Sequence, residues 1–222
     1  MSYENVFLDS RWEIIKSISR SSKSPTELAK KTKTSIANMS IQLRLLEALD
    51  LVEKQKLSTV TRGKPRTLYS LKKDFAYIVY ASDVGSDKKF MKLNKRNKLM
   101  FNILFLIKSD LEYYLQKFIF NNYDLFHDIQ SLSFIGATEN EIELFFVMDN
   151  PQKYYEKYSN YIIEKGAESK KVKLYLHNKK EIMDGVFHNN EYFISLVTKS
   201  TILYDDNQFL IKQQGRGKNK NE

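Results

Sequence analysis

The sequence predicts an α+β chain built from an N-terminal domain of short helices and a β-hairpin, a long connecting helix and a small C-terminal α/β domain. Three patterns predict this class. A helix start signal, two helical repeats and a hairpin pattern follow one another between residues 24 and 71. An apolar helical pattern runs from 94 to 121, and strand and helix patterns alternate after residue 130. We therefore divide the chain into residues 1–90, 91–130 and 131–210, followed by a tail, 211–222, that is expected to be disordered.

The N-terminal domain is predicted to begin with three helices. The first covers residues 5–20, and Trp12 is expected to anchor its packing because an indole buries a large area. Its apolar face is expected to consist of Val6, Leu8, Trp12, Ile15 and Ile18. The second begins at Ser24-Pro25-Thr26-Glu27, which contains an N-cap serine, a proline at the first helical position and a glutamate three residues after the cap. It ends at Lys31, with Leu28 and Ala29 facing inward.

The third helix is expected over about Ser35 to Leu49, after a polar turn at residues 32–34. Ser35 is its predicted N-cap. The residues expected to face the core are Ile36, Met39, Leu43, Leu46 and Leu49. Its other side chains are small or carry amides, together with Arg44, whereas ordinary exposed helix faces carry more Lys and Glu. Close approach to base edges and hydrogen bonding to them require such side chains, so we predict a recognition helix; the alternative is an ordinary amphipathic helix.

A hairpin pattern follows, with strands at 51–57 and 67–71 around a basic turn at residues 61–66. Together these elements predict a winged helix-turn-helix that binds double-stranded DNA. The side chains expected to contact bases are Ser35, Asn38, Ser40 and Gln42. Those expected to contact the phosphate backbone from the helices are Lys30, Lys33 and Arg44. Three cations of the wing are expected to contact phosphates or to reach a minor groove: Arg62, Lys64 and Arg66.

The order of these motifs resembles the winged helix-turn-helix of ArsR-like prokaryotic regulators. The resemblance rests on LAKKTKTSIANMSIQLRLLEALDLVEK followed by TRGKPRTLYSL, and it covers about the first third of the chain. It implies a dimeric regulator. Asp50 stands where that family usually has glycine after the recognition helix, and Asp tolerates the left-handed backbone conformation better than most residues.

Residues 72–93 are predicted to hold a strand at 75–80, either pairing with the wing or forming an extended linker. The long helix from Asn94 to about Asn121 is apolar nearly all round between Leu99 and Ile107. A helix of this kind is buried on all sides, either by a second copy of the chain or inside one domain. We expect a homodimer, since such regulators read two half-sites.

The C-terminal domain is predicted to contain four strands and two helices. The strands are expected at 132–135, 141–148, 172–176 and 201–204, and the helices at 151–165, closed by Gly166, and at 179–199, with a break near Asn189-Asn190. This order resembles small nucleotidyltransferase-like domains. The matching pieces are Phe134-Ile135-Gly136-Ala137, Glu141-Ile142-Glu143, Lys171-Val172-Lys173 and His188-Asn189-Asn190-Glu191-Tyr192-Phe193 before Ile202-Leu203-Tyr204.

The chain departs from that family where the chemistry resides. Such transferases hold two metal ions between three carboxylates. Here Ala137 replaces a serine, Glu141 and Glu143 replace aspartates, and Lys171 and Lys173 occupy the third acidic region. We therefore predict a catalytically silent domain with no catalytic residues, no metal and no cofactor. The histidines, His127, His177 and His188, have no metal-type spacing.

Composition adds a charge asymmetry. The net charge is +9, and residues 1–74 hold 15 Lys and Arg against 8 Asp and Glu, whereas residues 131–210 hold 9 against 12. Positive charge thus concentrates around the predicted helix-turn-helix, as expected for a nucleic-acid contact. The chain has no cysteine, its first residues do not resemble a signal peptide, and its longest apolar run is too short to span a bilayer. We expect a cytoplasmic protein without membrane contact.

The sequence thus predicts a sequence-specific, dimeric, double-stranded DNA-binding transcription regulator rather than an enzyme. Two alternatives stay open. One is an active metal-dependent nucleotidyltransferase that its helix-turn-helix directs to a target. The other is an adaptor whose winged helix binds another polypeptide.

Overall fold

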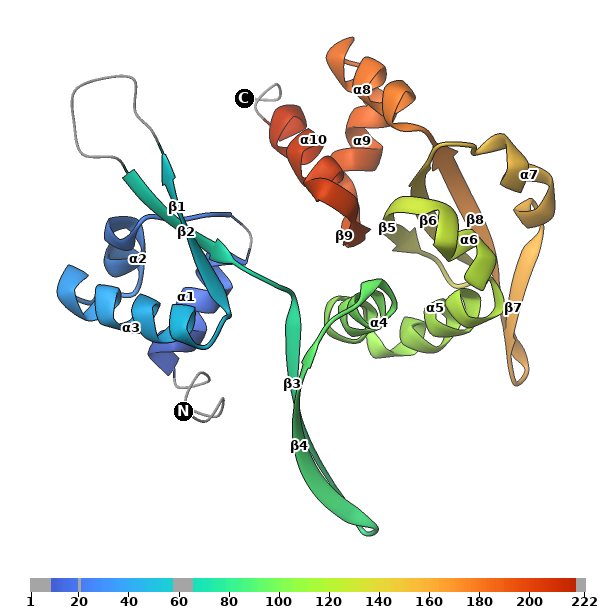
Figure 1. Ribbon diagram of the computed structural model, residues 1–222. Coiled ribbons are helices and arrows are strands. Elements are labelled where there is room, and N and C mark those ends of the chain that lie inside the picture. The colour runs from blue at the N-terminus through green and yellow to red at the C-terminus, as the bar shows by residue number, and fades with distance from the viewer. Residues whose placement is uncertain (1–8, 20, 58–65, 219–222) are drawn as a thin grey trace. The chain divides into compact units, whose positions relative to one another are not determined.

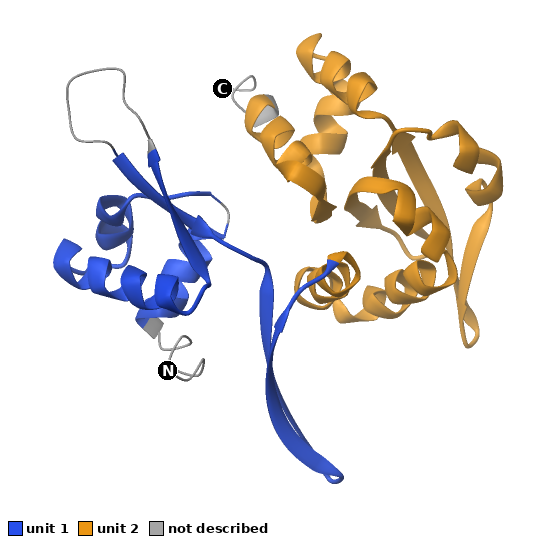
Figure 2. Ribbon diagram, in the orientation of Figure 1, with its two compact units in different colours: residues 1–94 blue, residues 95–222 orange. Residues whose placement is uncertain are grey.

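The computed structural model describes residues 9–19, 21–57 and 66–218, which fold as a mixed α+β chain (Figure 1). The chain divides into two compact units, residues 1–94 and 95–222 (Figure 2).

Unit 1 contains three helices and two antiparallel hairpins. Its elements are α1 (Asp9–Ile18), α2 (Pro25–Lys31), α3 (Ile36–Ala48), β1 (Val52–Leu57), β2 (Arg66–Leu71), β3 (Phe75–Ser82) and β4 (Gly85–Lys92). β1 pairs with β2 in a register that joins Val52 to Leu71 and Leu57 to Arg66. The core forms where the inward side chains of the helices meet the hairpin; its fully or almost fully buried members are Ile14, Ile15, Ile18, Leu28, Ala29, Met39, Leu43, Leu46, Leu51 and Val52.

The prediction for Trp12 is wrong. Its side chain is 42% exposed, because α1 turns Ile14, Ile15 and Ile18 toward the core instead. Val6 and Leu8, the other apolar residues expected on this helix, lie outside the described residues.

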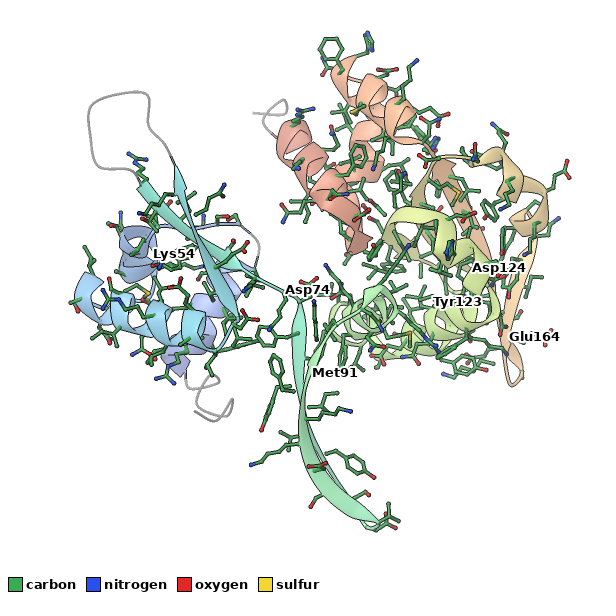
Figure 3. All side chains as sticks on the ribbon, in the orientation of Figure 1. Lys54, Asp74, Met91, Tyr123, Asp124 and Glu164 are labelled. Carbon is green, nitrogen blue, oxygen red and sulfur yellow. The ribbon has the colours of Figure 1, made fainter. Side chains whose placement is uncertain are left out.

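The strand predicted at 75–80 does not pair with the wing, and it is not an extended linker. β3 pairs with β4 over its whole length, from Phe75 opposite Lys92 to Ser82 opposite Gly85, and the two form a separate two-stranded sheet. The rings of Phe75 and Phe90 stack at 5.4 Å between centroids and pack against the unit 1 core. Nearer the hairpin turn the side chains of β3 and β4 point away from the hairpin (Figure 3). Val79 is 73% exposed and Val84 is 86% exposed.

Unit 2 is a five-stranded mixed sheet with helices on both faces. Its elements are α4 (Lys95–Leu106), α5 (Ser109–Asn121), α6 (Tyr123–Asp128), β5 (Ile129–Ala137), β6 (Glu141–Met148), α7 (Gln152–Tyr158), β7 (Tyr161–Lys165), β8 (Glu168–His177), α8 (Lys179–Phe187), α9 (Glu191–Lys199), β9 (Thr201–Asp205), the 3₁₀ turn Asp206–Gln208 and α10 (Phe209–Lys218). The strand order is β7-β8-β6-β5-β9, with β6 parallel to β8 and the other neighbours antiparallel.

Side chains that alternate along β6 explain why a hydrophobic core lies on each face of the sheet. Leu144 and Phe146 point into a core shared with α4 to α7, whereas Phe145 and Val147 point into a core shared with α8 to α10. All four side chains are at most 1% exposed. A strand buried on both faces reads as a continuous apolar run, as residues 144–148 do.

The single helix predicted over residues 94–121 is in fact two helices, α4 and α5. The helical pattern breaks at Ile107 and Lys108, and α5 starts anew at Ser109. A single helix over residues 94–121 would be roughly 42 Å long at 1.5 Å per residue. The break instead lets Ile103 of α4 and Phe118 of α5, both fully buried, enter one core.

Two further predictions fail in unit 2. Residues 161–165, expected to be helical, form edge strand β7, and Gly166, with φ of 61°, lies in the two-residue turn to β8 rather than ending a helix. The tail, expected to be disordered, forms α10 as far as Lys218. The Asp205 carboxylate accepts hydrogen bonds from the backbone N–H groups of Leu210 and Ile211, each at 3.0 Å, which caps this helix.

Candidate nucleic-acid interface

Local hydrogen bonds cap the N-terminus of α2 and the N-terminus of α3. At the start of α2 the Ser24 hydroxyl accepts from the backbone N–H of Glu27, and the Glu27 carboxylate accepts from the backbone N–H of Ser24. The Ser24 hydroxyl also donates to the Glu27 carboxylate, and this bond, together with the one from the Ser24 N–H, holds the pKa of Glu27 below its usual value. At the start of α3 the Ser35 hydroxyl accepts from the Asn38 backbone N–H at 3.1 Å. Both caps predicted from the sequence are therefore confirmed.

The buried side of α3 is narrower than the sequence predicted. Met39, Leu43 and Leu46 have no exposed surface, but Ile36, expected in the core, is 53% exposed. Ile36 lies in the first turn of α3, beside the hollow that faces β2, where no core residue covers it. Ile41 is 55% exposed, so the outward side of α3 presents aliphatic as well as polar groups.

One flank of α3 carries a chain of side-chain hydrogen bonds. Arg11 Nε of α1 donates to Gln42 Oε1 at 2.6 Å, and Gln42 Nε2 donates to Asn38 Oδ1 at 3.2 Å. Asn38 Nδ2 then donates to Thr34 Oγ1 at 2.9 Å. The structure thus brings together two predicted base-contacting residues, Asn38 and Gln42, and holds both amides in defined orientations. It adds Arg11, which the sequence reasoning missed because its partner is 31 positions away.

The opposite flank holds the other predicted residues. Ser40 donates to the backbone carbonyl of Ile36 at 2.8 Å, so its hydroxyl lies against its own helix. Ser40, Ile36 and Arg66 line one surface hollow between α3, the start of α2 and β2. Ser40 is therefore separated from Asn38 and Gln42 by the width of the helix, while Arg66 of the hairpin shares its side.

The predicted phosphate-contacting cations lie around these two flanks. The four that the structure describes are exposed, and none forms an ion pair with another described residue: Lys30, Lys33, Arg44 and Arg66. Lys33 takes a left-handed conformation, with φ of 53°, in the turn before α3. Arg62 and Lys64 lie outside the described residues.

Asp50 adopts the left-handed conformation expected at its position, with φ of 59°. Its carboxylate accepts from Lys72 Nζ at 2.5 Å and from Lys73 Nζ at 2.6 Å. These two bonds lower the pKa of Asp50 to about 2. Asp50 therefore joins the end of α3 to the chain that leaves β2, a contact that glycine at this position lacks.

Glu141 and Glu143, which stand in the place of the aspartates of nucleotidyltransferase-like domains, already interact with neighbouring side chains. Glu143 Oε1 accepts from Tyr175 OH at 2.7 Å and from Lys173 Nζ at 2.9 Å, and Lys173 Nζ lies 3.9 Å from Glu141. The Tyr175 and Lys173 donors lower the pKa of Glu143. In the described part of the chain no group of three or more His, Cys, Asp or Glu residues is placed to hold a metal ion.

No protein-family model matches the chain, and no curated protein matches its sequence. Among the described residues no helix is both long and apolar enough to cross a bilayer. The candidate interface therefore rests on the chain's own residues.

Proposed function

We propose that the chain is a sequence-specific, double-stranded DNA-binding transcription regulator in which residues 24–71 form a winged helix-turn-helix. The observation that carries the proposal is one flank of α3. It holds two oriented amides, exposed Asn38 and half-buried Gln42, beside a face whose Met39, Leu43 and Leu46 side chains are fully buried. A helix that reads bases in the major groove needs this combination of donors and acceptors on a rigid support.

The surroundings of α3 support the same proposal. Unpaired cations lie on α2, on the turn, on α3 and on β2, so they flank the helix on both sides. Cations that form no ion pair are available to a polyanion, and phosphates are the usual partner of such an arrangement. Ala37, next to the amides, is small enough to let the helix backbone approach the bases, and Ile41 offers an apolar surface to a thymine methyl group.

We further propose that the regulator acts as a homodimer through α4. The C-terminal turn of this helix exposes three successive apolar side chains, Leu104 to 48%, Phe105 to 76% and Leu106 to 52%. A second copy of the same turn is an occupant of matching chemistry, since a two-fold interface pairs a surface with itself. Sedimentation of the wild type and of Phe105→Glu tests this: the wild type is expected to dimerise and the variant to be monomeric. A monomeric wild type at micromolar concentration contradicts it.

The experiment that tests DNA binding measures affinity for random-sequence duplex and for the DNA upstream of the chain's own gene, each across a salt series. We expect a steep and shared salt slope, because both duplexes release counterions, and a tighter complex with the upstream DNA near physiological salt. Equal and weak binding to both duplexes refutes sequence reading. Weak binding without salt dependence points to a polypeptide partner for the winged helix instead.

A further inference from the structure

A cavity of about 220 Å³ lies within unit 2, between the first turns of α4, the end of α5 and α6. Its apolar wall is made by Leu99, Ile119 and Phe126, each at most 6% exposed. Its rim carries the polar ends of Lys95, Arg96, Tyr123 and His127. The volume is below the roughly 300–1,000 Å³ of sites for drug-sized ligands, so it suits a molecule with a single ring or a short branched chain.

The rim is cationic where a helix begins. Lys95 and Arg96 are the first two residues of α4, and the first turn of this helix carries no acid. The N-terminus of a helix bears a partial positive charge, so acidic residues are favoured there and cations are disfavoured. Two adjacent cations at this end are therefore in an unfavourable field that a bound anion would relieve.

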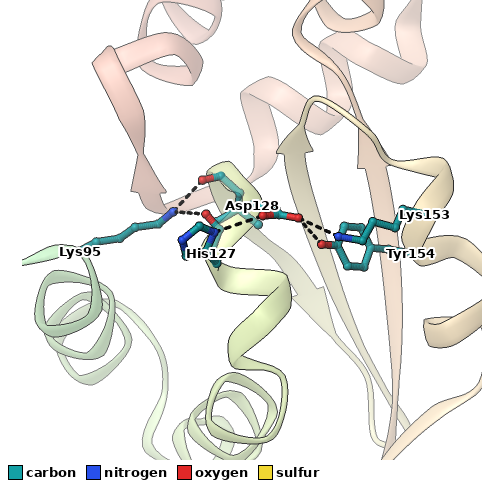
Figure 4. Close-up of polar contacts among 6 residues, drawn as sticks. Lys95, His127, Asp128, Lys153 and Tyr154 are labelled. Atoms are coloured by element: carbon teal, nitrogen blue, oxygen red, sulfur yellow. Dashed lines mark hydrogen bonds and ion pairs between the residues drawn. The ribbon is translucent and has the colours of Figure 1, made fainter.

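Lys95 is also held in place without a carboxylate partner. Its Nζ donates to the backbone carbonyl of Ile129 at 2.8 Å (Figure 4). The same Nζ lies over the Tyr204 ring, 4.9 Å from the centroid. Burial without an ion pair lowers the pKa of Lys95. The carboxylate of Asp128, the residue before Ile129, instead accepts from Tyr154 OH and Lys153 Nζ (Figure 4).

Arg96 is available to a ligand in a different way. Its guanidinium lies over the exposed ring of Phe120, 5.1 Å from the centroid, and in the described part of the chain it forms neither a hydrogen bond nor an ion pair. All five of its N–H donors are thus free to bind a carboxylate or a phosphate in the planar geometry that arginine favours.

We propose that this cavity binds a small organic anion, with its carboxylate or phosphate between Lys95 and Arg96 and its apolar body against Leu99, Ile119 and Phe126. The proposal does not depend on DNA binding, because every residue that carries it belongs to unit 2 and every residue of the candidate DNA interface belongs to unit 1.

The test uses the full-length chain without DNA. Benzoate and phenyl phosphate are the probes, benzamide is the uncharged counterpart of benzoate, and inorganic phosphate lacks the apolar body. Titration calorimetry measures affinity, and proton NMR of the three histidine rings locates the ligand, since His127 lines the cavity whereas His177 and His188 do not. We expect saturable binding of benzoate or phenyl phosphate, a shift of the His127 ring signals alone, and at least tenfold weaker binding of benzamide and of inorganic phosphate.

Variants identify the cations. Arg96→Gln is expected to weaken binding about tenfold, the equivalent of one charge-assisted hydrogen bond. Lys95→Gln is expected to do the same, but it also removes the bond to Ile129 and risks unfolding α6, so Arg96→Gln carries the test. Lys108→Gln is the matched control, because Lys108 is exposed in the break between α4 and α5 and does not line the cavity. Equal affinity for benzoate and benzamide, wild-type affinity in Arg96→Gln, or no saturable binding of either anion at millimolar concentration overturns the proposal.

Discussion

Asn38→Ala separates DNA reading from folding more sharply than any other substitution on α3. The Asn38 side chain donates to Thr34 Oγ1 and accepts from Gln42 Nε2, both at the exposed surface. A carboxamide has two donor hydrogens and two acceptor lone pairs, so one of each stays free after these bonds. A donor and an acceptor side by side match N7 and N6 of adenine in the major groove.

The hydrogen bonds of Asn38 allow the expected loss of folding stability and the expected loss of base discrimination to be compared. Loss of two exposed hydrogen bonds destabilises the fold by roughly 0.5–1 kcal/mol each. Alanine returns about 0.5 kcal/mol or more through its higher helix propensity. The Ser35 cap is kept because it uses the backbone N–H of residue 38. We therefore expect the free energy of unfolding to fall by about 0.5–1.5 kcal/mol. Discrimination at one base pair is expected to fall by about 1–3 kcal/mol, or 5- to 150-fold.

The assay is fluorescence anisotropy on a duplex selected by the wild-type chain from a random pool, with each base pair of the duplex then changed in turn. Asn140→Ala is the matched control, since Asn140 is an exposed asparagine of unit 2. Urea unfolding of each variant measures its stability. Equal losses on the selected and on random duplex, or an affinity change in Asn38→Ala no larger than that in Asn140→Ala, would refute the role of Asn38 as a base-reading residue.

Four further outcomes follow from the structure. Arg66→Gln is expected to weaken binding to every duplex alike and to lower the slope of log K against log salt by about 0.9, which a salt series checks. Lys33→Gly is expected to raise the free energy of unfolding by roughly 1 kcal/mol in thermal melts while weakening DNA binding, because a non-glycine residue in the left-handed region is strained. Phe118→Ala is expected to cost about 3–5 kcal/mol in urea unfolding followed by circular dichroism, since its ring is fully buried. Phe120→Ala, two residues along the same helix at a 56% exposed position, is expected to cost under about 1.5 kcal/mol, and similar costs for the two would contradict the burial argument. Asp128, whose pKa is lowered from 3.8 to about 2 mainly by a tyrosine hydroxyl, is expected to stabilise the fold above pH 4 and to lose that effect as the pH falls through 2, so the stability difference between the wild type and Asp128→Asn should shrink over that window.

The elements predicted well from the sequence are those with signals inside a few residues. The capping box at Ser24, the cap at Ser35 and the break between α8 and α9, where Asn189 has φ of 57° and Asn190 caps the next helix, were all predicted. The long helix was wrong because neither glycine nor proline marks its break. The sheet and the core that α4 and α5 share decide that break, since both helices must bury apolar residues there. Gly166 was misread because glycine ends helices and also forms hairpin turns, and only pairing of β7 with β8 decides between them.

In the candidate interface, too, contacts between residues close in sequence were predictable, whereas contacts that depend on the tertiary fold were not. Asn38 and the Ser35 cap interact within four residues along the chain, and the helical pattern predicted both. Arg11 reaches Gln42 only because α1 packs against α3, and no local rule brings them together. Its charge-assisted bond orients the amide at one end of the polar chain, so the direction in which Gln42 presents its remaining donor depends on the tertiary fold. The sequence therefore predicts most of the polar side chains that lie outside the core on α3, although it misplaces Ile36, and the structure adds how Arg11 orients one of them.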